Sequence, residues 1–223
     1  MSKLMGDPRI DPRLKEYLAS VTDPNALPTG PSDALWSGEG LEERDIAIRS
    51  APDDNEIYLR VARPAGDEVL GCVYWIHGGG MAQGSAYDVR TIPRARMLAH
   101  LGVAVVAVDF RNCSAPPCDA AVLPAGFGTT EVAPYPAGLN DCYSGLQWVQ
   151  DHASELRIDS SQTIVAGPSG GGNLTIAVAL LAKQRGKLDL LPQGFYALCP
   201  YIAGTWPQDV RPPPLAVRRL EPC

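Results

Sequence analysis

Four short apolar runs, each nearly uninterrupted, constrain the fold of this chain more than any other feature. They are residues 69–76, 103–108, 163–166 and 195–198. Runs of this length without polar alternation are typical of strands that are buried on both faces. Amphipathic helical patterns separate them, at roughly 90–101, 137–156 and 170–185. This alternation predicts right-handed crossovers and an α/β fold, with a mostly parallel sheet covered by helices on both faces.

An antiparallel hairpin is expected before these strands. Ile46 and Ile48 alternate with polar neighbours, and Ile57 begins a second alternating run. The two runs are separated by Pro-Asp-Asp-Asn at 52–55, a sequence typical of a turn.

The sequence predicts three parts along the 223 residues. Residues 1–42 are expected to form a cap helix, at about 11–21, and a linker. Residues 43–206 are expected to form the core, with an aperiodic stretch at 113–130 that either caps the site or is foreign to the fold. Residues 207–223 are rich in Pro and Arg and are expected to be disordered or extended.

Composition excludes several classes of protein. No window approaches the roughly 18 unbroken apolar residues of a membrane helix, so no membrane span is expected. The net charge of −6 would repel a phosphate backbone, so nucleic acid is not an expected partner. The N-terminal residues show no secretory signal, and a cytoplasmic location follows by default. The six cysteines are expected to be small buried hydrophobes.

The first chemical motif is His77-Gly78-Gly79-Gly80, directly after the apolar run 69–76. Successive glycines allow a turn whose N–H groups point one way, because no Cβ restricts φ or blocks a ligand. Such donors form the oxyanion hole of acyl-transfer enzymes. The alternative is a flexible glycine turn without chemistry.

The second motif is Gly167-Pro168-Ser169-Gly170-Gly171, between the run 163–166 and the helical pattern that follows. A serine on a sharp strand-to-helix turn has its Oγ exposed at the carboxyl edge of the sheet, near a helix N-terminus that favours anions. The alternative is a serine that only caps the helix.

Four motifs in register resemble the hormone-sensitive-lipase-like α/β-hydrolase esterases. They are His77–Gly80, Val108-Asp109-Phe110-Arg111, Tyr135–Cys142 and Gly167–Leu174. The resemblance implies an eight-stranded hydrolase fold with an N-terminal helical cap. It identifies Ser169 as the catalytic nucleophile and the amides of Gly79, Gly80 and Gly170 as the oxyanion donors. His77, with Gly78, is expected to support the oxyanion loop and not to act as the general base.

The sequence departs from that family in two places. Pro168 and Gly170 replace the Asp and Ala that usually flank the serine. No histidine follows Ser169, whereas α/β-hydrolases place the acid and then the histidine after the nucleophile. His100 and His152 lie on expected helices away from the site, and Asp209 comes too early to match the acid. We therefore expect the triad histidine, the triad acid and the last strands to be absent.

These observations predict a serine carboxylesterase by descent, which acts on a small carboxylic ester and needs no metal or organic cofactor. Two alternatives stay open: a ligand-binding protein without turnover, as the plant gibberellin receptors of this family are, and an incomplete gene product without function. The run 195–198 would form an unpaired apolar edge, which predicts self-association.

Overall fold

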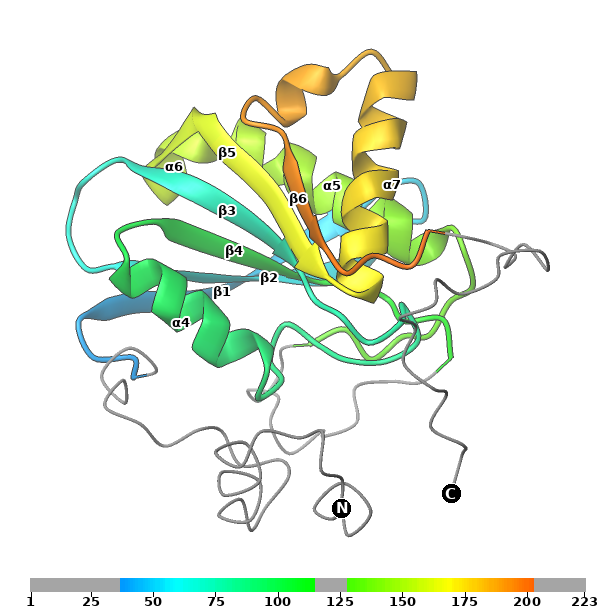
Figure 1. The fold of residues 1–223 in the computed structure, drawn as a ribbon, viewed down its shortest axis with the longest axis horizontal. Coiled ribbons are helices and arrows are strands. Elements are labelled where there is room, and N and C mark those ends of the chain that lie inside the picture. The colour runs from blue at the N-terminus through cyan, green and yellow to red at the C-terminus, as the bar shows by residue number, and fades with distance from the viewer. Residues whose placement is uncertain (1–36, 115–127, 203–223) are drawn as a thin grey trace, which may run out of the picture. The chain divides into compact units, whose positions relative to one another are not determined.

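A computed structural model describes residues 37–114 and 128–202, all of which belong to the larger of two compact units, Trp36–Cys223 (Figure 1). The strands are β1 (Leu41–Ser50), β2 (Asn55–Pro64), β3 (Leu70–Ile76), β4 (Ala104–Asp109), β5 (Ile158–Pro168) and β6 (Phe195–Leu198). The helices are α4 (Thr91–His100), α5 (Ala137–Asp151), α6 (Ala153–Leu156), α7 (Gly170–Gln184) and a 3-10 turn at Leu188–Leu190.

The described strands form one sheet in the order β1-β2-β4-β3-β5-β6. β1 and β2 form the expected antiparallel hairpin, and β2 is antiparallel to β4. The pairs β4–β3, β3–β5 and β5–β6 are parallel. The prediction of a mostly parallel α/β sheet that begins with a hairpin is confirmed.

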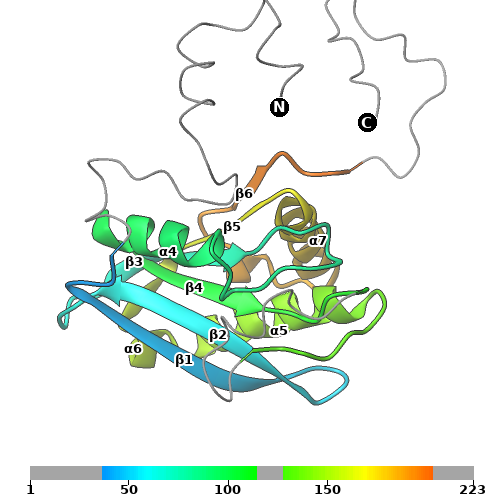
Figure 2. The ribbon, with the colours of Figure 1, turned by 90° about the horizontal axis from the view of Figure 1, so that it is seen from below.

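Helices cover both faces of this sheet, as the uninterrupted apolar strands predicted. Successive side chains of a strand point to opposite faces. Accordingly, Val105 of β4 packs with Ala95 and Ala99 of α4, whereas Val106 belongs to the larger core that α5 and α7 cover. Figure 2 shows α4 on one side of the sheet and α5 on the other.

Two boundaries differ from the sequence prediction. The expected helix 137–156 is two helices, because the backbone leaves helical geometry at His152 (φ −110°, ψ 22°). β5 begins at Ile158, five residues before the expected strand. The sequence did not predict this part of the strand, because residues 159–162 are polar and form no apolar run. The expected cap helix at 11–21 and the tail 207–223 lie outside the described residues, as does most of the stretch 113–130, so the three predicted parts stay a prediction.

The cysteines follow the expectation only in part. Cys72 and Cys142 are buried in the core, but Cys113 and Cys199 are exposed, which corrects the prediction for these two. Both exposed cysteines follow the carboxyl end of a parallel strand, where the chain leaves the core. Over 37–114 and 128–202, no helix has the length and apolar character needed to cross a membrane.

Candidate active site

The residues singled out in the sequence meet at one edge of the sheet. His77 follows β3, Asp109 ends β4 and Ser169 follows β5. β3 lies between β4 and β5 and is parallel to both, so the carboxyl ends of the three strands lie at one edge of the sheet. Ligands of open α/β sheets bind at this edge, where successive crossovers diverge to opposite faces.

Ser169 stands on a strained turn between β5 and α7. Its backbone has φ 54° and ψ −119°, a conformation that L-residues rarely adopt. It occupies the N-cap position of α7, yet its side chain makes no capping hydrogen bond and the residue is exposed. This geometry disfavours the alternative of a simple capping serine, because the hydroxyl is free to meet a ligand.

The turn is possible because α7 begins against the end of β3. A Cβ on Gly171 would lie 2.1 Å from the Ile76 carbonyl oxygen and 2.5 Å from that of His77. A glycine is therefore required at 171 for the close approach of helix and strand.

The triple-glycine loop lies directly beside this turn. A Cβ built on Gly170 would be 2.7 Å from the amide nitrogens of both Gly80 and Met81, so the two backbones are in contact. Gly79 has φ 112°, and its carbonyl accepts the N–H groups of Ala82 and Gln83, which closes the loop.

Two of the expected oxyanion donors, Gly80 and Gly170, therefore lie together beside Ser169, and Gly79 directly precedes Gly80 in the loop. Gly170 is the first residue of α7, and its N–H is one of the four that a helix leaves without an intrahelical partner. The amides of Gly79 and Gly80 donate no backbone hydrogen bond within the described residues. N–H groups of this kind, beside an exposed serine, are available to an anion.

His77 lies behind the loop and is buried. Its ring stacks on Phe110 with centroids 4.1 Å apart, and Nδ1 lies 2.8 Å from the Gly78 carbonyl oxygen. Burial lowers the pKa of His77 and so favours the neutral ring, although the Asp109 carboxylate opposes this. These contacts fit a support for the glycine loop and place the ring away from solvent.

Asp109 holds the far end of the same loop, a role that the sequence analysis did not assign. Its Oδ1 accepts hydrogen bonds from the Ser85 hydroxyl (2.7 Å) and the Ala86 amide (2.8 Å), and its Oδ2 accepts the Thr129 amide (2.6 Å). Burial raises the pKa of this carboxyl, and the hydrogen bonds and His77 counteract it. The sequence marked Asp109 only by its place at the end of an apolar strand and within the motif Val108–Arg111, neither of which indicates this role.

Comparisons with known proteins agree with this geometry. Residues 131–215 match a family model described as the alpha/beta hydrolase fold. The match ends nine residues after position 206, where the sequence analysis expected the core to end. Carboxylesterase NlhH of Mycobacterium tuberculosis is 33% identical over 147 residues, which are 66% of this chain and 40% of that protein. The solved esterase Est22 is 40% identical, with a TM-score of 0.76 over 93% of this chain and 65% of its own.

A third relative indicates the branch of the α/β hydrolases to which the chain is similar. The solved brefeldin A esterase, a bacterial homologue of human hormone-sensitive lipase, is 36% identical, with a TM-score of 0.64 over 84% of this chain and 46% of its own. The chain belongs to the hormone-sensitive-lipase-like α/β hydrolases. It spans about two fifths of the length of the NlhH carboxylesterase and about two thirds of Est22.

Neither of the other two histidines of the chain lies at Ser169. His100 ends α4, and its Nε2 lies 3.1 Å from the Ser37 carbonyl oxygen. His152 follows α5 and stacks on Trp148, with centroids 4.0 Å apart. As expected from the sequence, both have packing contacts on helices, and the described residues supply no imidazole to the nucleophile.

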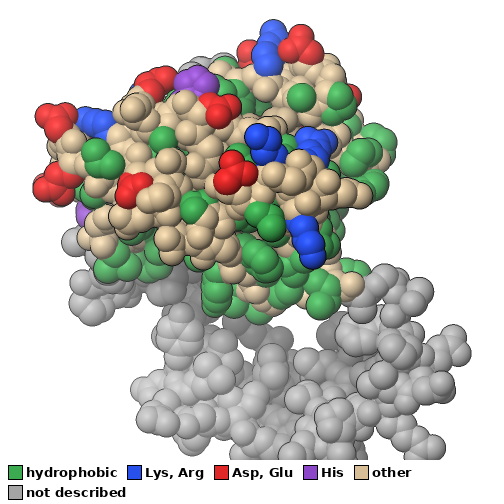
Figure 3. All heavy atoms as spheres, turned by 90° about the horizontal axis from the view of Figure 1, so that it is seen from above, with side chains coloured by type: hydrophobic (Ala, Val, Ile, Leu, Met, Phe, Trp, Pro, Cys, Tyr) green, Lys and Arg blue, Asp and Glu red, His purple; other side chains and the backbone are tan. Residues whose placement is uncertain are grey.

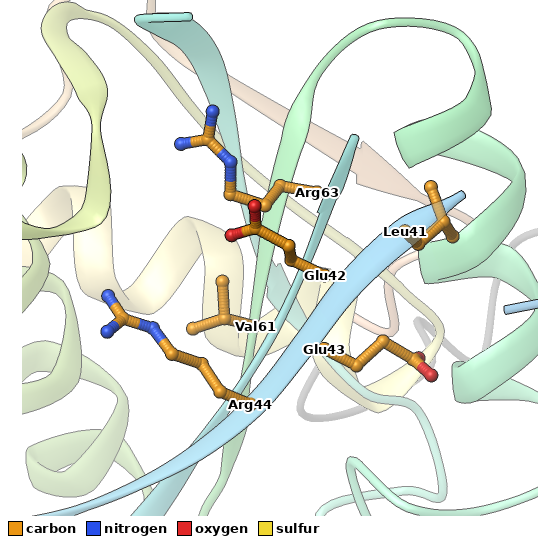
Figure 4. A pocket seen from close by; sticks show the side chains of 6 residues that line it. All are labelled: Leu41, Glu42, Glu43, Arg44, Val61 and Arg63. Carbon is orange, nitrogen blue, oxygen red and sulfur yellow. The ribbon is translucent and has the colours of Figure 1, made fainter. Parts of the chain in front are cut away.

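A separate hollow of about 410 Å³ lies on the antiparallel hairpin formed by β1 and β2 (Figure 4). It is lined by Leu41, Glu42, Glu43, Arg44, Val61 and Arg63. Four of these residues lie on β1, and three of the four carry ion pairs. The guanidinium of Arg63 donates hydrogen bonds to backbone carbonyls, among them those of Leu156 (2.8 Å) and Glu68 (2.6 Å). Because β1 and β2 form the opposite margin of the sheet from β6, this hollow is not part of the site at Ser169.

Proposed function

We propose that this chain carries the nucleophile and oxyanion hole of a serine carboxylic-ester hydrolase that acts on small esters. The observation that carries the proposal is the exposed Ser169, on a strained turn, in backbone contact with the triple-glycine loop. Three relatives named as esterases support it.

The reaction follows from this arrangement. Ser169 Oγ attacks the ester carbonyl carbon while its proton passes to a base. The carbonyl oxygen becomes an oxyanion, which accepts hydrogen bonds from the amides of Gly79, Gly80 and Gly170. The C–O bond to the alcohol then breaks, the alcohol leaves with a proton, and an acyl-serine remains. Water attacks that acyl group, releases the carboxylic acid and restores the serine.

Acylation of the full chain tests the nucleophile directly. The chain is incubated with p-nitrophenyl acetate, with and without added imidazole as an external base, and the acetylated peptides are mapped by mass spectrometry. We expect acetylation at Ser169 that is slow without imidazole and faster by about 10²-fold with it.

Two variants control that experiment. Ser169→Ala should remove the adduct, whereas Ser161→Ala, which changes another exposed serine, should retain it. Acetyl groups spread over several serines, or an adduct that survives Ser169→Ala, would contradict the proposal.

A second function, ligand binding without turnover, is favoured by one observation: none of the three histidines of the sequence contacts Ser169. Without a base the hydroxyl stays protonated and is a weak nucleophile. A small ester that raises the melting temperature of the chain, and is recovered intact after prolonged incubation, would support binding. Release of its alcohol would exclude it.

A further inference from the structure

The segment that follows β4 runs along the loop 77–86, which contains the triple glycine. Asp109, at the start of this segment, accepts hydrogen bonds from Ser85 and Ala86. Three more bonds join the two segments: Asn112 Nδ2 donates to the Gly84 carbonyl oxygen at 2.9 Å, the Cys113 amide to that of Met81 at 2.9 Å, and the Ser114 hydroxyl to that of Ala82 at 3.2 Å. The position of the loop therefore depends on the segment after β4.

Asn112 is the buried side chain of these three contacts. Its Nδ2 bonds to Gly84, whereas its Oδ1 is buried and has no hydrogen-bond partner within residues 37–114 and 128–202. An amide that is buried with one polar atom unpaired costs free energy, and a leucine of similar shape would pack there at lower cost. The single bond to Gly84 is what distinguishes the amide from a leucine at this position.

A role on the molecular surface does not account for this amide. Figure 3 shows charged and apolar side chains spread over one face of the molecule, with the apolar ones more frequent toward the bottom of the view. At 2% exposure, Asn112 belongs to no such surface. Its contribution must therefore pass through the backbone that it contacts.

Gly84 packs directly against the triple glycine. It has φ 102°, and a Cβ on it would lie 2.8 Å from the Gly78 carbonyl oxygen and 3.0 Å from His77 Nδ1. The Gly78 carbonyl and the Gly79 N–H belong to one planar peptide unit, so the contact with Gly84 also sets the direction of that N–H.

The next peptide unit is fixed from the same side. The Gly79 carbonyl accepts the amides of Ala82 and Gln83, and it shares its plane with the Gly80 N–H. A Cβ on Gly79 would lie 1.9 Å from the Gln83 carbonyl oxygen, which belongs to the peptide unit that leads into Gly84. Movement of Gly84 would therefore turn both expected oxyanion amides.

Asn112 can act as a fixed point because it is held from a second side. Its carbonyl accepts the Ala133 amide at 3.0 Å, and it forms an isolated parallel bridge with Val132. Its backbone is thus anchored independently of the loop 77–86.

We propose that Asn112 is a positioning residue of the oxyanion hole, which holds the Gly84 carbonyl and thereby aims the amides of Gly79 and Gly80 at the substrate. The inference rests on the proposed function. Asn112 is buried and acts through Gly84, so it has no contact with the ester itself.

Asn112→Leu tests this role, because it removes the donor and keeps a side chain of similar shape. Acetylation of Ser169 in the full chain is followed with p-nitrophenyl acetate and imidazole over a range of ester concentrations. We expect the rate at saturating ester to fall by about 10- to 100-fold, since a misplacement of about 1 Å can cost about 10²-fold. The half-saturating ester concentration should change less than twofold.

Gln150→Met is the matched control. Gln150 Nε2 donates to the Leu190 carbonyl oxygen at 3.2 Å, so this variant also removes a bond from a side-chain amide to a backbone carbonyl, but between α5 and the 3-10 turn. It should acylate at the parent rate. Melting curves of both variants establish that they are folded.

Asn112→Asp gives a readout in pH that a merely structural role would not move. An ionised carboxylate has no proton to donate to the Gly84 carbonyl, whereas a protonated carboxyl has one. The acylation rate of this variant, divided by that of the parent chain at the same pH, should therefore rise at least threefold from pH 8 to pH 5. The same ratio for Asn112→Leu should stay flat. This comparison also decides the question if Asn112→Leu does not fold.

Hydrogen exchange reports on the loop without any acylation. The amides of Ala82 and Gln83, which bond to the Gly79 carbonyl, should exchange at least fivefold faster in Asn112→Leu and at the parent rate in Gln150→Met. Unchanged exchange at both amides would overturn the inference.

The acylation results can also overturn it. A fall of less than twofold in a folded Asn112→Leu, an equal fall in Gln150→Met, or an Asn112→Asp ratio that is independent of pH would each do so. If Ser169 is acetylated in no chain while exchange still quickens only in Asn112→Leu, the proposed function fails and the positioning of the loop by Asn112 stands.

Discussion

Arg111 and Asp141 form a buried two-pronged ion pair between the segment after β4 and helix α5. Arg111 Nε lies 2.9 Å from Asp141 Oδ2, and Nη2 lies 3.0 Å from Oδ1. The Ser50 hydroxyl donates to the same carboxylate at 2.6 Å, which joins the hairpin to the pair. Burial acts to lower the pKa of Arg111, but the hydrogen bonds and charges of Asp141, Asp53 and Glu131 together outweigh it and raise that pKa. This ion pair therefore fixes the position of helix α5 relative to the segment that follows β4.

Replacement of Asp141 by Asn should destabilise the fold strongly. The Asp141 side chain is fully buried, and its loss of charge leaves the Arg111 guanidinium, 3% exposed, with only the partly exposed Asp53 and Glu131. Breaking a buried pair by removing one partner costs about 3–5 kcal/mol. Urea unfolding measures the change, and a loss below about 1 kcal/mol would contradict the central role of the pair.

Gly171→Ala should destabilise the chain far more than Gly71→Ala. A Cβ at 171 would lie 2.1 Å from the Ile76 carbonyl oxygen, a backbone atom, whereas a Cβ at 71 would lie 3.4 Å or more from its neighbours. Overpacking of this kind costs about 1–3 kcal/mol. Thermal melting of the two variants gives the comparison, and equal melting temperatures would show that α7 moves away from β3 at little cost.

Gly79→Ala should impair acylation of Ser169. The residue has φ 112°, and an added Cβ would lie 1.9 Å from the Gln83 carbonyl oxygen, so the loop must open. Loss of one oxyanion donor lowers rates by about 10²–10³-fold. Acetylation of Ser169 by p-nitrophenyl acetate with imidazole measures the effect. Gly102→Ala, which shares a positive φ but has open space around it, is the control for backbone strain and should acylate normally.

The sequence predicted those parts of the molecule that depend on one local pattern. The run 195–198 became β6 with the same bounds because the apolar side chains are bounded by Gly194 on one side and by Cys199-Pro200 on the other. Ser169 and Gly80 were found because glycine spacing reports a backbone requirement directly. The alternation of strands and helices then placed both at one edge of the sheet.

What the sequence could not predict depends on contacts between distant segments. Nothing local marks Asp109 as the acceptor for Ser85 and Thr129, each at least 20 residues away. Likewise, Arg111 and Asp141 are 30 residues apart, and although each lies in a motif of the family resemblance, nothing in the sequence marks them as partners. Such pairings arise from the order of β4 and α5 in the fold.

The thiols should react in two classes. Burial raises the pKa of the Cys72 thiol to about 12, and it also raises that of Cys142, whereas Cys113 and Cys199 are exposed. Iodoacetamide at pH 8 should therefore modify Cys113 and Cys199 in the folded chain, and Cys72 and Cys142 only after unfolding. Peptide mapping identifies the sites. Modification of Cys72 in the folded chain at the rate of Cys113 would contradict the core packing.

Acid should weaken the fold through His77. Because burial lowers its pKa, the folded chain keeps the ring neutral while the unfolded chain binds a proton near pH 6.5. The unfolded state then binds more protons, so the free energy of unfolding falls as pH decreases below about 6.5, by up to about 1.4 kcal/mol per pH unit. The raised pKa of Asp109 acts in the opposite direction, because the folded chain is the first to bind that proton as pH falls.

Urea unfolding of the parent chain and of His77→Gln between pH 7.5 and 5 isolates the contribution of the imidazole. The variant should be less stable at pH 7.5 and should lose less stability on acidification, since it has no ring to protonate. Identical slopes for the two chains would mean that His77 is already protonated beside Asp109, in which case the glycine loop is held by a charged ring and not by a neutral one.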